Sequence, residues 1–326
     1  MRILVIFTGG TIGSSVKGDW ISPDGSTQSQ LLFEYRQKTK KDEVVFSTLA
    51  PYNILSENLS AKQLNTLITC VTDEEQKEYD GIIVTHGTDT LQYSAAALDF
   101  TLQKRLPVVL VSADYPLDDE RSNGLKNFAA AVRFLKEKPQ AGVYVAYKNA
   151  LEKEVNIHLA TRLLAHAEGS ADLYSLEAPY AMVDLALDKV ICSRLPLSKG
   201  SGVGKIVLCE KPPILVVDSR PESSFGYHLE GIKAVLLSPY HSGTLNTASE
   251  DFIAFCGSCK QKGVPVFLIN APQGATYSSA KPFEELGIIP LPSTARIAAF
   301  VKCWIAISLK KEVKDFLLTP LSNEFI

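Results

Sequence analysis

The sequence predicts an α/β protein with a doubly wound, mostly parallel sheet and a second, smaller α/β domain. Three observations lead to this fold class. The chain has 326 residues, more than one hydrophobic core usually organises. Short apolar runs alternate with longer amphipathic stretches, the pattern that builds a parallel sheet covered on both faces. This alternation breaks once, near residues 183–212, and then resumes, which predicts two domains.

Five short apolar runs predict the strands of the first domain. Each run is nearly continuous rather than alternating, as expected of a parallel strand that is buried on both faces. Five strands separated by helices make an open sheet more economical than a closed barrel. The predicted strands span residues 3–7, 44–47, 81–85, 108–112 and 142–146.

The helices expected between these strands are amphipathic. The clearest one follows Ser60, a residue type favoured at the N-cap position, and ends in a charged stretch at residues 74–77. Two further helices are predicted at residues 91–102 and 122–136. The apolar positions with helical spacing in the first of these helices are Leu64, Leu67, Ile68 and Val71.

The break in the pattern sets the expected domain boundaries. We expect a first domain at residues 1–182, a linker at 183–212, where Pro, Gly and Ser accumulate, and a second domain at 213–326. The strands predicted in the second domain span residues 214–217, 234–238 and 264–268, and its helices span 249–262 and 295–309.

The composition excludes several classes of protein. Apolar residues are 46% and charged residues 21% of the chain, close to globular averages. The net charge is −3 and the Lys and Arg residues are scattered, so we expect no nucleic-acid partner. No apolar stretch approaches the roughly 18 residues that span a membrane. The apolar run at residues 3–7 is too short for a signal peptide, so we expect a cytoplasmic protein.

The cysteines do not predict a metal site. Only Cys256 and Cys259 have the close spacing of a zinc-ligand pair, and a zinc site needs a second pair or spaced histidines. The histidines at positions 158, 166, 228 and 241 have no such spacing. We therefore expect free thiols and no metal.

Two loops that follow predicted strands share a Gly-Thr arrangement. In an open parallel sheet, ligands bind beyond the carboxyl ends of the strands. Residues 8–14 include Gly10 and Thr11, and residues 85–90 include Gly87, Thr88 and Asp89. Glycines let backbone N–H groups approach an oxyanion, and each loop adds a Thr hydroxyl that becomes nucleophilic if a neighbouring group activates it. Residues 56–58 and 112–114 follow the second and fourth strands and should lie at the same edge.

Structural interpretations of these loops compete with catalysis. The glycine spacing lacks the G-x-G-x-x-G pattern, the P-loop Lys and a suitable acidic residue, so nucleotide binding is disfavoured. Thr88 with Asp89 is, on its own, as often a helix cap as a catalytic pair. His86 taken singly is more often a structural residue with a hydrogen bond than a base.

In these two loops the chain resembles the bacterial-type L-asparaginases, and most of all their cytoplasmic, or type I, branch. The resemblance rests on residues 8–13, Thr-Gly-Gly-Thr-Ile-Gly, and residues 85–90, Thr-His-Gly-Thr-Asp-Thr, in this order and each after a predicted strand. It extends through residues 106–110 and 121–124 and, more weakly, through the second domain. The resemblance covers most of the chain.

This resemblance implies an activity and roles for individual residues. The implied reaction is hydrolysis of the side-chain amide of L-asparagine to L-aspartate and ammonia, without metal or organic cofactor. Thr11 matches the primary nucleophile, and Thr88 and Asp89 match the second Thr and the Asp that binds the substrate amino group. Ser56 and Glu57 match the pair that contacts the carboxylate and amino groups. The family also implies a homodimer or a homotetramer.

The sequence departs from the family at two positions. Trp20 stands in the stretch where the family usually has a Tyr that hydrogen-bonds the nucleophile. Arg162 is the nearest cationic match to the family's Lys, and another placement of the gap puts Leu164 there. Arg stays protonated and cannot act as a general base. Arg162 therefore either acts only through its charge, or the protein has low activity or another substrate. A third possibility is that Arg162 simply forms a salt bridge.

Two other functions therefore compete with asparagine hydrolysis. One is a non-catalytic or weakly active homologue that binds an amino acid. The other is an amidotransferase subunit that acts on a charged transfer RNA and shares this domain pair. That subunit has an additional N-terminal domain, whereas the first predicted strand here starts at Arg2, so we expect this function less.

Overall fold

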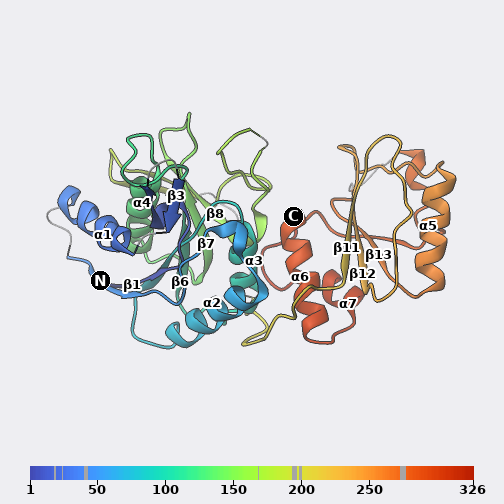
Figure 1. Ribbon diagram of the computed structural model, residues 1–326, viewed down its shortest axis with the longest axis horizontal. Helices are drawn as coiled ribbons and strands as arrows, with labels where there is room; N and C mark the ends of the chain where they lie inside the picture. Colours follow the sequence, from blue (N-terminus) through green and yellow to red (C-terminus); the bar gives the residue numbers. More distant parts are fainter. Residues whose placement is uncertain are drawn as a thin grey trace. The chain divides into compact units, whose positions relative to one another are not determined.

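The chain forms two compact units, Met1–Ile206 and Val207–Ile326 (Figure 1). This computed structural model describes residues 1–17, 20–23, 25–39, 43–167, 169–192, 197, 200–271 and 277–326. The expected linker at 183–212 contains the boundary between the two units. It also contains strand β10 (Lys189–Cys192), which belongs to the sheet of the first unit. Residues 193–196, 198 and 199 of that segment lie outside the described residues.

The first unit is built on an eight-stranded sheet with the order β10-β9-β8-β7-β6-β5-β1-β4. The five predicted strands are confirmed, and all five run parallel. Three strands that the sequence did not predict extend the sheet from β7 in antiparallel pairs. The bounds are β1 Arg2–Phe7, β4 Val45–Leu49, β5 Gly81–Thr85, β6 Pro107–Val111, β7 Gly142–Tyr147, β8 Val155–Leu159 and β9 Ala181–Asp184.

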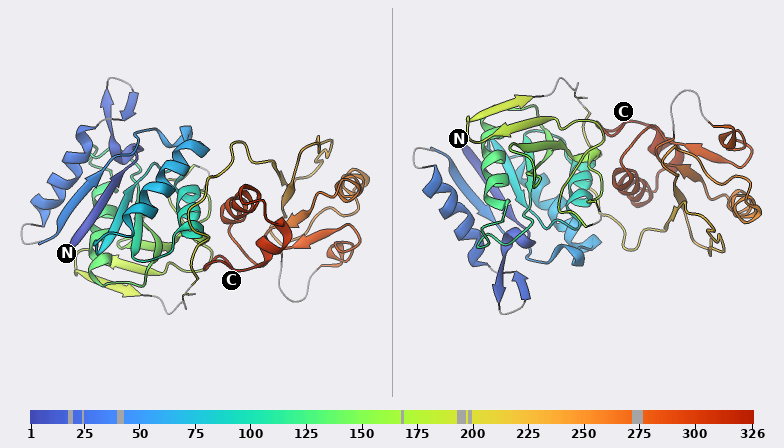
Figure 2. Two further views of the ribbon diagram at one scale, coloured as in Figure 1. Left: turned by 90° about the horizontal axis from the view of Figure 1, so that it is seen from below. Right: turned by 90° about the horizontal axis from the view of Figure 1, so that it is seen from above.

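Helices cover both faces of this sheet, so the doubly wound α/β class is confirmed (Figures 1 and 2). Alternate residues of β1 point to opposite faces, and Ile3, Val5 and Phe7 pack in one core with helices on their side. That side carries α1 (Ser26–Lys38) and α4 (Gly124–Lys136). The other side carries α2 (Ala61–Glu74) and α3 (Leu91–Thr101).

Helix α2 begins after Ser60, as predicted, although the hydroxyl does not cap the backbone. Ser60 Oγ donates instead to Gln63 Oε1. The four apolar residues predicted for this helix, Leu64, Leu67, Ile68 and Val71, are each at most 1% exposed. Burying each of them contributes about 1.5–3 kcal/mol, so the apolar face attaches the helix to the sheet.

A short hairpin follows the first loop. Its strands are β2 (Ser14–Lys17) and β3 (Trp20–Pro23), and β3 packs next to the 3₁₀ turn η1 (Thr11–Gly13). Figure 2 shows the hairpin projecting from the body of the first unit. The hairpin thus places β3 beside the loop of Thr11.

The second unit has its own sheet of four parallel strands, in the order β11-β12-β13-β14. Helix α5 packs in the core on one face, while α6 and α7 pack in the core on the other. The sequence missed β14 and α7, which are short. The bounds are β11 Ile214–Asp218, β12 Ala234–Ser238, β13 Val266–Leu268, β14 Ile288–Pro290, α5 Glu250–Gln261, α6 Arg296–Ser308 and α7 Val313–Leu318.

Within the described residues, every helix is too short or too polar to cross a bilayer. All six cysteines are free, and Cys256 and Cys259 are buried within α5.

Candidate active site

The loops after β1, β4 and β5 meet at the carboxyl edge of the first sheet. The loop after β1 is held to the loop after β4 by two backbone hydrogen bonds. Gly10 N–H donates to Ile54 O at 2.8 Å, and Ile54 N–H donates to Thr8 O at 3.2 Å. The hydroxyl of Thr8 also donates to Thr85 O at 2.6 Å, which ties the first loop to the end of β5. These bonds fix the positions from which the candidate side chains extend.

The two glycine-threonine loops touch through their glycines. Gly10 has a φ of 75°, a left-handed conformation that glycine adopts without strain. A Cβ atom at Gly10 would collide with the backbone of Gly87 and of His86. Only glycine therefore allows the backbones of the two loops to approach this closely.

Ser56 links the loop after β4 to the loop that carries Asp89. Ser56 Oγ donates to Asp89 Oδ2 at 3.2 Å, and Thr90 Oγ1 donates to Ser56 O at 2.9 Å. A Cβ atom at Gly87 would collide with the Ser56 side chain. Ser56 is 5% exposed, whereas Asp89 reaches the surface, so the carboxylate of Asp89 can meet a solvated ligand.

Thr11 and Thr88 are half-buried, one on each of the touching loops. No acceptor for their backbone N–H groups is found among the described residues. Two unpaired N–H groups on adjoining loops can together donate to one oxyanion. Within the same residues, no carboxylate or imidazole is hydrogen-bonded to either hydroxyl. The described part of the two loops therefore presents two Thr hydroxyls and two N–H groups, with no Thr-base pair among these residues.

The helix-cap interpretation of Thr88 and Asp89 is not supported. The N-cap of α3 is Thr90, and no side chain caps that helix end. Asp89 accepts from Ser56 instead. The side chains of both residues are thus available for another role.

Arg162 lies in a 3₁₀ turn, η3 (Ala160–Arg162), which packs against α3. Its side chain is 9% exposed, and Nη1 donates to Glu177 Oε2 at 2.5 Å. The salt-bridge interpretation is thus confirmed as a contact. Leu164, the alternative match, accepts through its backbone oxygen from Gln92 Nε2 at 3.3 Å. This bond ties the loop after η3 to the first turn of α3.

The other predicted site positions are Trp20, Glu57 and residues 112–114. Trp20 is 76% exposed on β3, so its indole lies largely in solvent. Glu57 is exposed next to Ser56. Residues 112–114 follow β6, which runs parallel to β5, so they lie at the same sheet edge, as predicted. Asp114 and Asn123 exchange hydrogen bonds of 3.0 and 2.9 Å between backbone N–H and side-chain oxygen, which tie this loop to the start of α4.

Sequence reasoning did not assign roles to Thr8 and Thr90. Their hydroxyls bond carbonyl groups of neighbouring loops and hold the cluster together. No sequence pattern shows which carbonyl group a hydroxyl will bond. The only sequence feature that could have indicated Thr8 and Thr90 is that they lie inside the two loop sequences.

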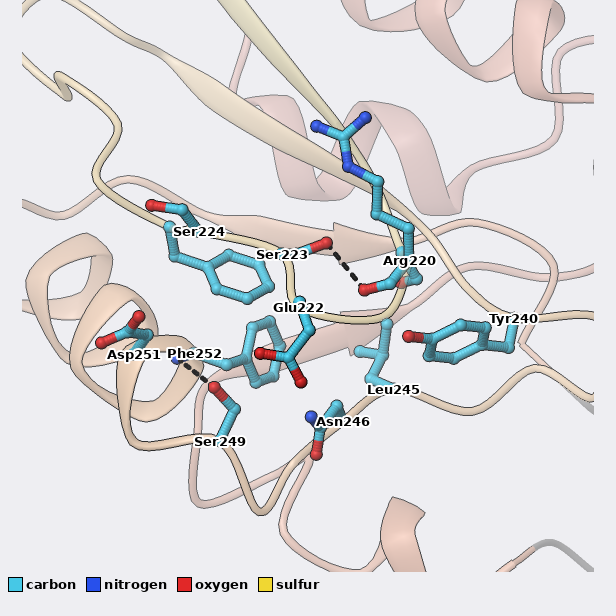
Figure 3. Close-up of a pocket in the computed structure, with 12 residues that line it drawn as sticks. Arg220, Glu222, Ser223, Ser224, Tyr240, Leu245, Asn246, Ser249, Asp251 and Phe252 are labelled. Carbon is cyan, nitrogen blue, oxygen red and sulfur yellow. Dashed lines mark hydrogen bonds between the residues drawn. The ribbon is translucent and has the colours of Figure 1, made fainter.

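A hollow in the second unit offers a different chemistry (Figure 3). It has a volume of about 200 Å³ and lies beyond the carboxyl ends of β11 and β12. Its hydroxyls serve local structure, since Ser223 Oγ donates to Arg220 O and Ser249 Oγ accepts from Phe252 N–H. Glu222 points into the hollow, while the Arg220 guanidinium points away (Figure 3). The hollow is polar but lacks a paired nucleophile.

Comparison with known proteins shows the family of the first unit. The family described as "Asparaginase, N-terminal" matches residues 2–176. A glutamyl-tRNA(Gln) amidotransferase subunit from Methanococcus vannielii is 26% identical over 319 residues, 92% of this chain and 73% of that protein. The corresponding protein of Methanococcus maripaludis is 28% identical over 290 residues, 83% of this chain and 68% of that protein.

Solved structures share the whole fold. The thermostable L-asparaginase from Thermococcus kodakarensis has a TM-score of 0.81 and 23% identity, covering 100% of this chain and 99% of that one. L-asparaginase I from Vibrio cholerae has a TM-score of 0.81 and 21% identity, with the same coverage. Likeness at these identities establishes a common fold.

Proposed function

The chain belongs to the asparaginase family, and we propose that it hydrolyses the side-chain amide of L-asparagine to L-aspartate and ammonia. The observation that carries the proposal is the backbone contact between Gly10 and Gly87. This contact brings Thr11 and Thr88 onto adjoining loops, next to the hydrogen-bonded pair of Ser56 and Asp89.

Each residue of the cluster has a proposed part in binding. The carboxylate of Asp89 holds the ammonium group of the substrate, because it is an exposed anion with a single Ser donor among the described residues. Ser56 and Glu57 contact the carboxylate and ammonium groups of the substrate. Gly10 and Gly87 have no side chain, so the substrate can approach the backbone N–H groups of Thr11 and Thr88. Trp20 contacts the substrate from β3, which packs beside the turn of Thr11.

The proposed reaction proceeds through an ester. Thr11 Oγ attacks the carbon of the side-chain amide, and the N–H groups of Thr11 and Thr88 bind the resulting oxyanion. The proton from Thr11 passes to the leaving nitrogen, the C–N bond breaks, and ammonia departs. Water then attacks the ester carbon, the bond to Thr11 Oγ breaks, and aspartate leaves. The hydroxyl of Thr88 relays the proton from Thr11 Oγ to the leaving nitrogen in the first half, and the proton from water back to Thr11 Oγ in the second.

Arg162 contributes charge rather than proton transfer in this proposal. A guanidinium stays protonated throughout the physiological range. Its pairing with Glu177 also neutralises part of the positive charge. Losing a general base costs about 100-fold to 10,000-fold in rate, so we expect turnover below that of an enzyme with a Lys base.

The deciding experiment measures ammonia release from L-asparagine by the purified protein and by Thr11→Ala and Thr88→Ala. We expect both variants to lose at least about 100-fold in kcat, because each removes a reacting hydroxyl. The matched control is Thr66→Ala on α2, where an exposed hydroxyl only bonds Lys62 O at 2.9 Å. Full activity in Thr11→Ala would disprove the assignment, and inactivity of a folded parent protein would favour an amino-acid-binding homologue.

A second function is favoured by the relatives named as amidotransferase subunits. In that case the same site would release ammonia for transfer to a charged transfer RNA bound by another protein. Ammonia release that rises only when a partner subunit and the charged RNA are added would identify this function. Release by the purified chain alone at an unchanged rate would support the free hydrolase.

The proposed hydrolase is a cytoplasmic homodimer or homotetramer with a small amino acid as its substrate. Light scattering on the purified chain measures the number of subunits. Comparing asparagine with glutamine at equal concentration measures the substrate preference.

A further inference from the structure

The imidazole of His86 joins the loop of Thr88 to the second turn of α3. His86 is 2% exposed and Ser94 is 0% exposed. His86 Nδ1 lies 2.9 Å from Gly87 O, and Nε2 lies 2.8 Å from Ser94 Oγ. The backbone N–H of His86 donates to Val111 O at 2.9 Å, which anchors the residue to β6. Two contacts thus fix the ring, and a third fixes the backbone of His86.

These contacts determine where the proton of the ring lies. A carbonyl oxygen can only accept, so Nδ1 carries the proton that is donated to Gly87 O. In a neutral ring Nε2 then accepts from the hydroxyl of Ser94. Burial lowers the pKa of His86, which keeps the ring neutral. His86 therefore acts as a fixed donor to one peptide group rather than as a base.

The bond to Gly87 O also sets the direction of the next N–H group. The peptide between Gly87 and Thr88 is planar and trans, so its C=O and N–H groups point in opposite directions. With the carbonyl held toward the buried ring, the Thr88 N–H points away from it. That N–H has no acceptor among the described residues. The ring thus controls the orientation of an unpaired donor.

We infer that His86 is a positioning residue that aims the Thr88 N–H at the oxyanion formed during amide hydrolysis. This inference rests on the proposed function, because it assigns the N–H to the same site. His86 itself does not touch the reacting atoms. Its effect passes through the Gly87 carbonyl and the peptide plane.

A purely structural role for His86 makes different predictions. If the ring only connects the loop to α3, its removal lowers stability and leaves the kcat of the folded fraction unchanged. If the ring aims a donor that acts in the transition state, its removal lowers kcat while KM changes little. An Asn at this position places an amide donor near the position of Nδ1, so it should restore kcat only if donation to Gly87 O matters.

The test compares His86→Phe, which lacks the donor, with His86→Asn, which keeps one. Removing an oxyanion donor costs about 100-fold to 1,000-fold, so we expect a misaimed donor in His86→Phe to lower kcat about 10-fold to 100-fold. KM should stay within about threefold, and His86→Asn should stay within about fivefold of the parent kcat. Equal kcat in His86→Phe and the parent would overturn the inference, as would equal losses in Phe and Asn.

A matched control separates catalysis from the loss of a buried His–Ser contact. His158 is 1% exposed and its Nδ1 contacts Ser175 Oγ at 2.5 Å. We expect His158→Asn to lower stability while kcat stays within about threefold of the parent. If His86→Phe does not fold, Ser94→Ala retains the ring but frees Nε2. The kcat of Ser94→Ala should fall less than about tenfold, because Nδ1 can still donate to Gly87 O. A larger fall would contradict donation through Nδ1.

A second measurement does not depend on activity. The chain has five histidines, and the nitrogen-15 signals of His86 are identified by their loss in His86→Asn. A neutral ring protonated at Nδ1 is expected at pH 8, and a neutral ring protonated at Nε2 would overturn the inference.

If the parent releases no ammonia, the Thr88 amide signal is followed during L-aspartate addition. A shift in the parent that is absent in His86→Phe supports the positioning even when the proposed hydrolysis fails, and equal shifts overturn it.

Discussion

Ser56 Oγ donates a hydrogen bond of 3.2 Å to Asp89 Oδ2, although the two residues lie 33 positions apart in the chain. The bond joins the loop after β4 to the loop after β5 at the sheet edge. Hydrogen bonds to charged groups are stronger than neutral ones, and this one restrains a carboxylate that reaches the surface. The orientation of Asp89 therefore depends on Ser56.

Replacing Ser56 with Ala should weaken substrate binding more than turnover. The variant frees the Asp89 carboxylate to rotate, and a partly exposed bond of this kind contributes about 1 kcal/mol, or roughly fivefold in affinity. Steady-state ammonia release should show KM raised about fivefold with kcat within about twofold. Ser60→Ala, in which the lost hydroxyl contacts only Gln63, should change neither constant. An unchanged KM in Ser56→Ala would show that the bond does not orient the carboxylate.

Gly87→Ala should disrupt the site by steric collision. The new Cβ meets the side chain of Ser56, and overpacking of this kind typically costs about 1–3 kcal/mol. We expect a lower melting temperature and loss of most ammonia release. Adding Ser56→Gly removes the two colliding side-chain atoms and leaves the tight approach of Gly10 Cα at 3.0 Å, so it should recover part of the stability. The control is Gly257→Ala in α5, where a Cβ meets no atom within 4 Å and should raise stability slightly. Failure of the double variant to recover stability would contradict the steric explanation.

The central strands and the first-unit loops of the candidate site were predictable because each has a local signature. A buried parallel strand is a short apolar run, and β5 was predicted with its bounds unchanged. The glycines beside Thr11 and Thr88 are visible because close backbone approach excludes other residues. These features can be predicted because each is determined by residues within one short segment of the chain.

The remaining features depend on partners distant in sequence. Strands β9 and β10 were not predicted because they are short and only partly buried, and pairing within the sheet stabilises them. A salt bridge of Arg162 was predicted as one alternative, but its partner Glu177, at a φ of 60°, was not, because no sequence spacing specifies it. The hydroxyl of Ser60 bonds a side chain rather than the helix end, which shows that a favoured residue type does not fix its partner.

Arg162 and Glu177 allow a test of the electrostatic role. Arg162→Lys keeps positive charge, Arg162→Met removes it, and Glu177→Gln removes only the partner. If the charge assists hydrolysis, kcat should fall about 10-fold or more in Arg162→Met and little in Glu177→Gln. If the pair is only structural, both substitutions should lower stability without changing kcat. A gain in kcat in Arg162→Lys would indicate that a Lys base can be restored at this position.

Acid should destabilise the protein through His158. Burial lowers the pKa of His158 to about 3, well below its ordinary value. The unfolded chain therefore binds a proton at higher pH than the folded one. Above about pH 6.5, His158 is neutral in both states and the free energy of unfolding does not depend on its titration. As the pH falls from 6.5 toward 3, the free energy of unfolding decreases by about 1.4 kcal/mol per pH unit. Urea unfolding at pH 7 and 5 should show a smaller loss in His158→Asn than in the parent. Equal losses would show that another group dominates.

The second unit contains a buried ion pair between Lys302 and Glu324. Their side chains are 2% and 1% exposed, and Nζ lies 2.6 Å from Glu324 Oε1. Lys302 also donates to the backbone oxygens of Leu317 and Thr319 at 3.2 and 2.6 Å. Burial raises the pKa of Glu324, but the ammonium of Lys302 and the hydrogen bonds outweigh it and lower the pKa overall. For Lys302, burial is the larger effect and lowers the pKa in spite of Glu324, so the carboxylate is compensated more fully than the ammonium.

Removing one member of this pair should cost much more than removing both. Lys302→Met leaves a buried carboxylate without its cation, which typically costs about 3–5 kcal/mol, whereas Lys302→Met with Glu324→Gln leaves no buried charge. The lowered pKa of Glu324 means that its contribution is present above about pH 4.5 and is lost as the pH falls through the lowered value. In Lys302→Met the cation is gone and burial raises the pKa of Glu324, so the cost of the unpaired carboxylate falls as the pH drops toward 4.5. Urea unfolding at pH 7 should therefore separate the single from the double variant, and the difference should be lost by about pH 4.5. Lys314→Met, an exposed Lys on α7, provides the control. If Lys302→Met were no less stable than Lys314→Met, the pair would contribute nothing to holding the C-terminal segment against α6.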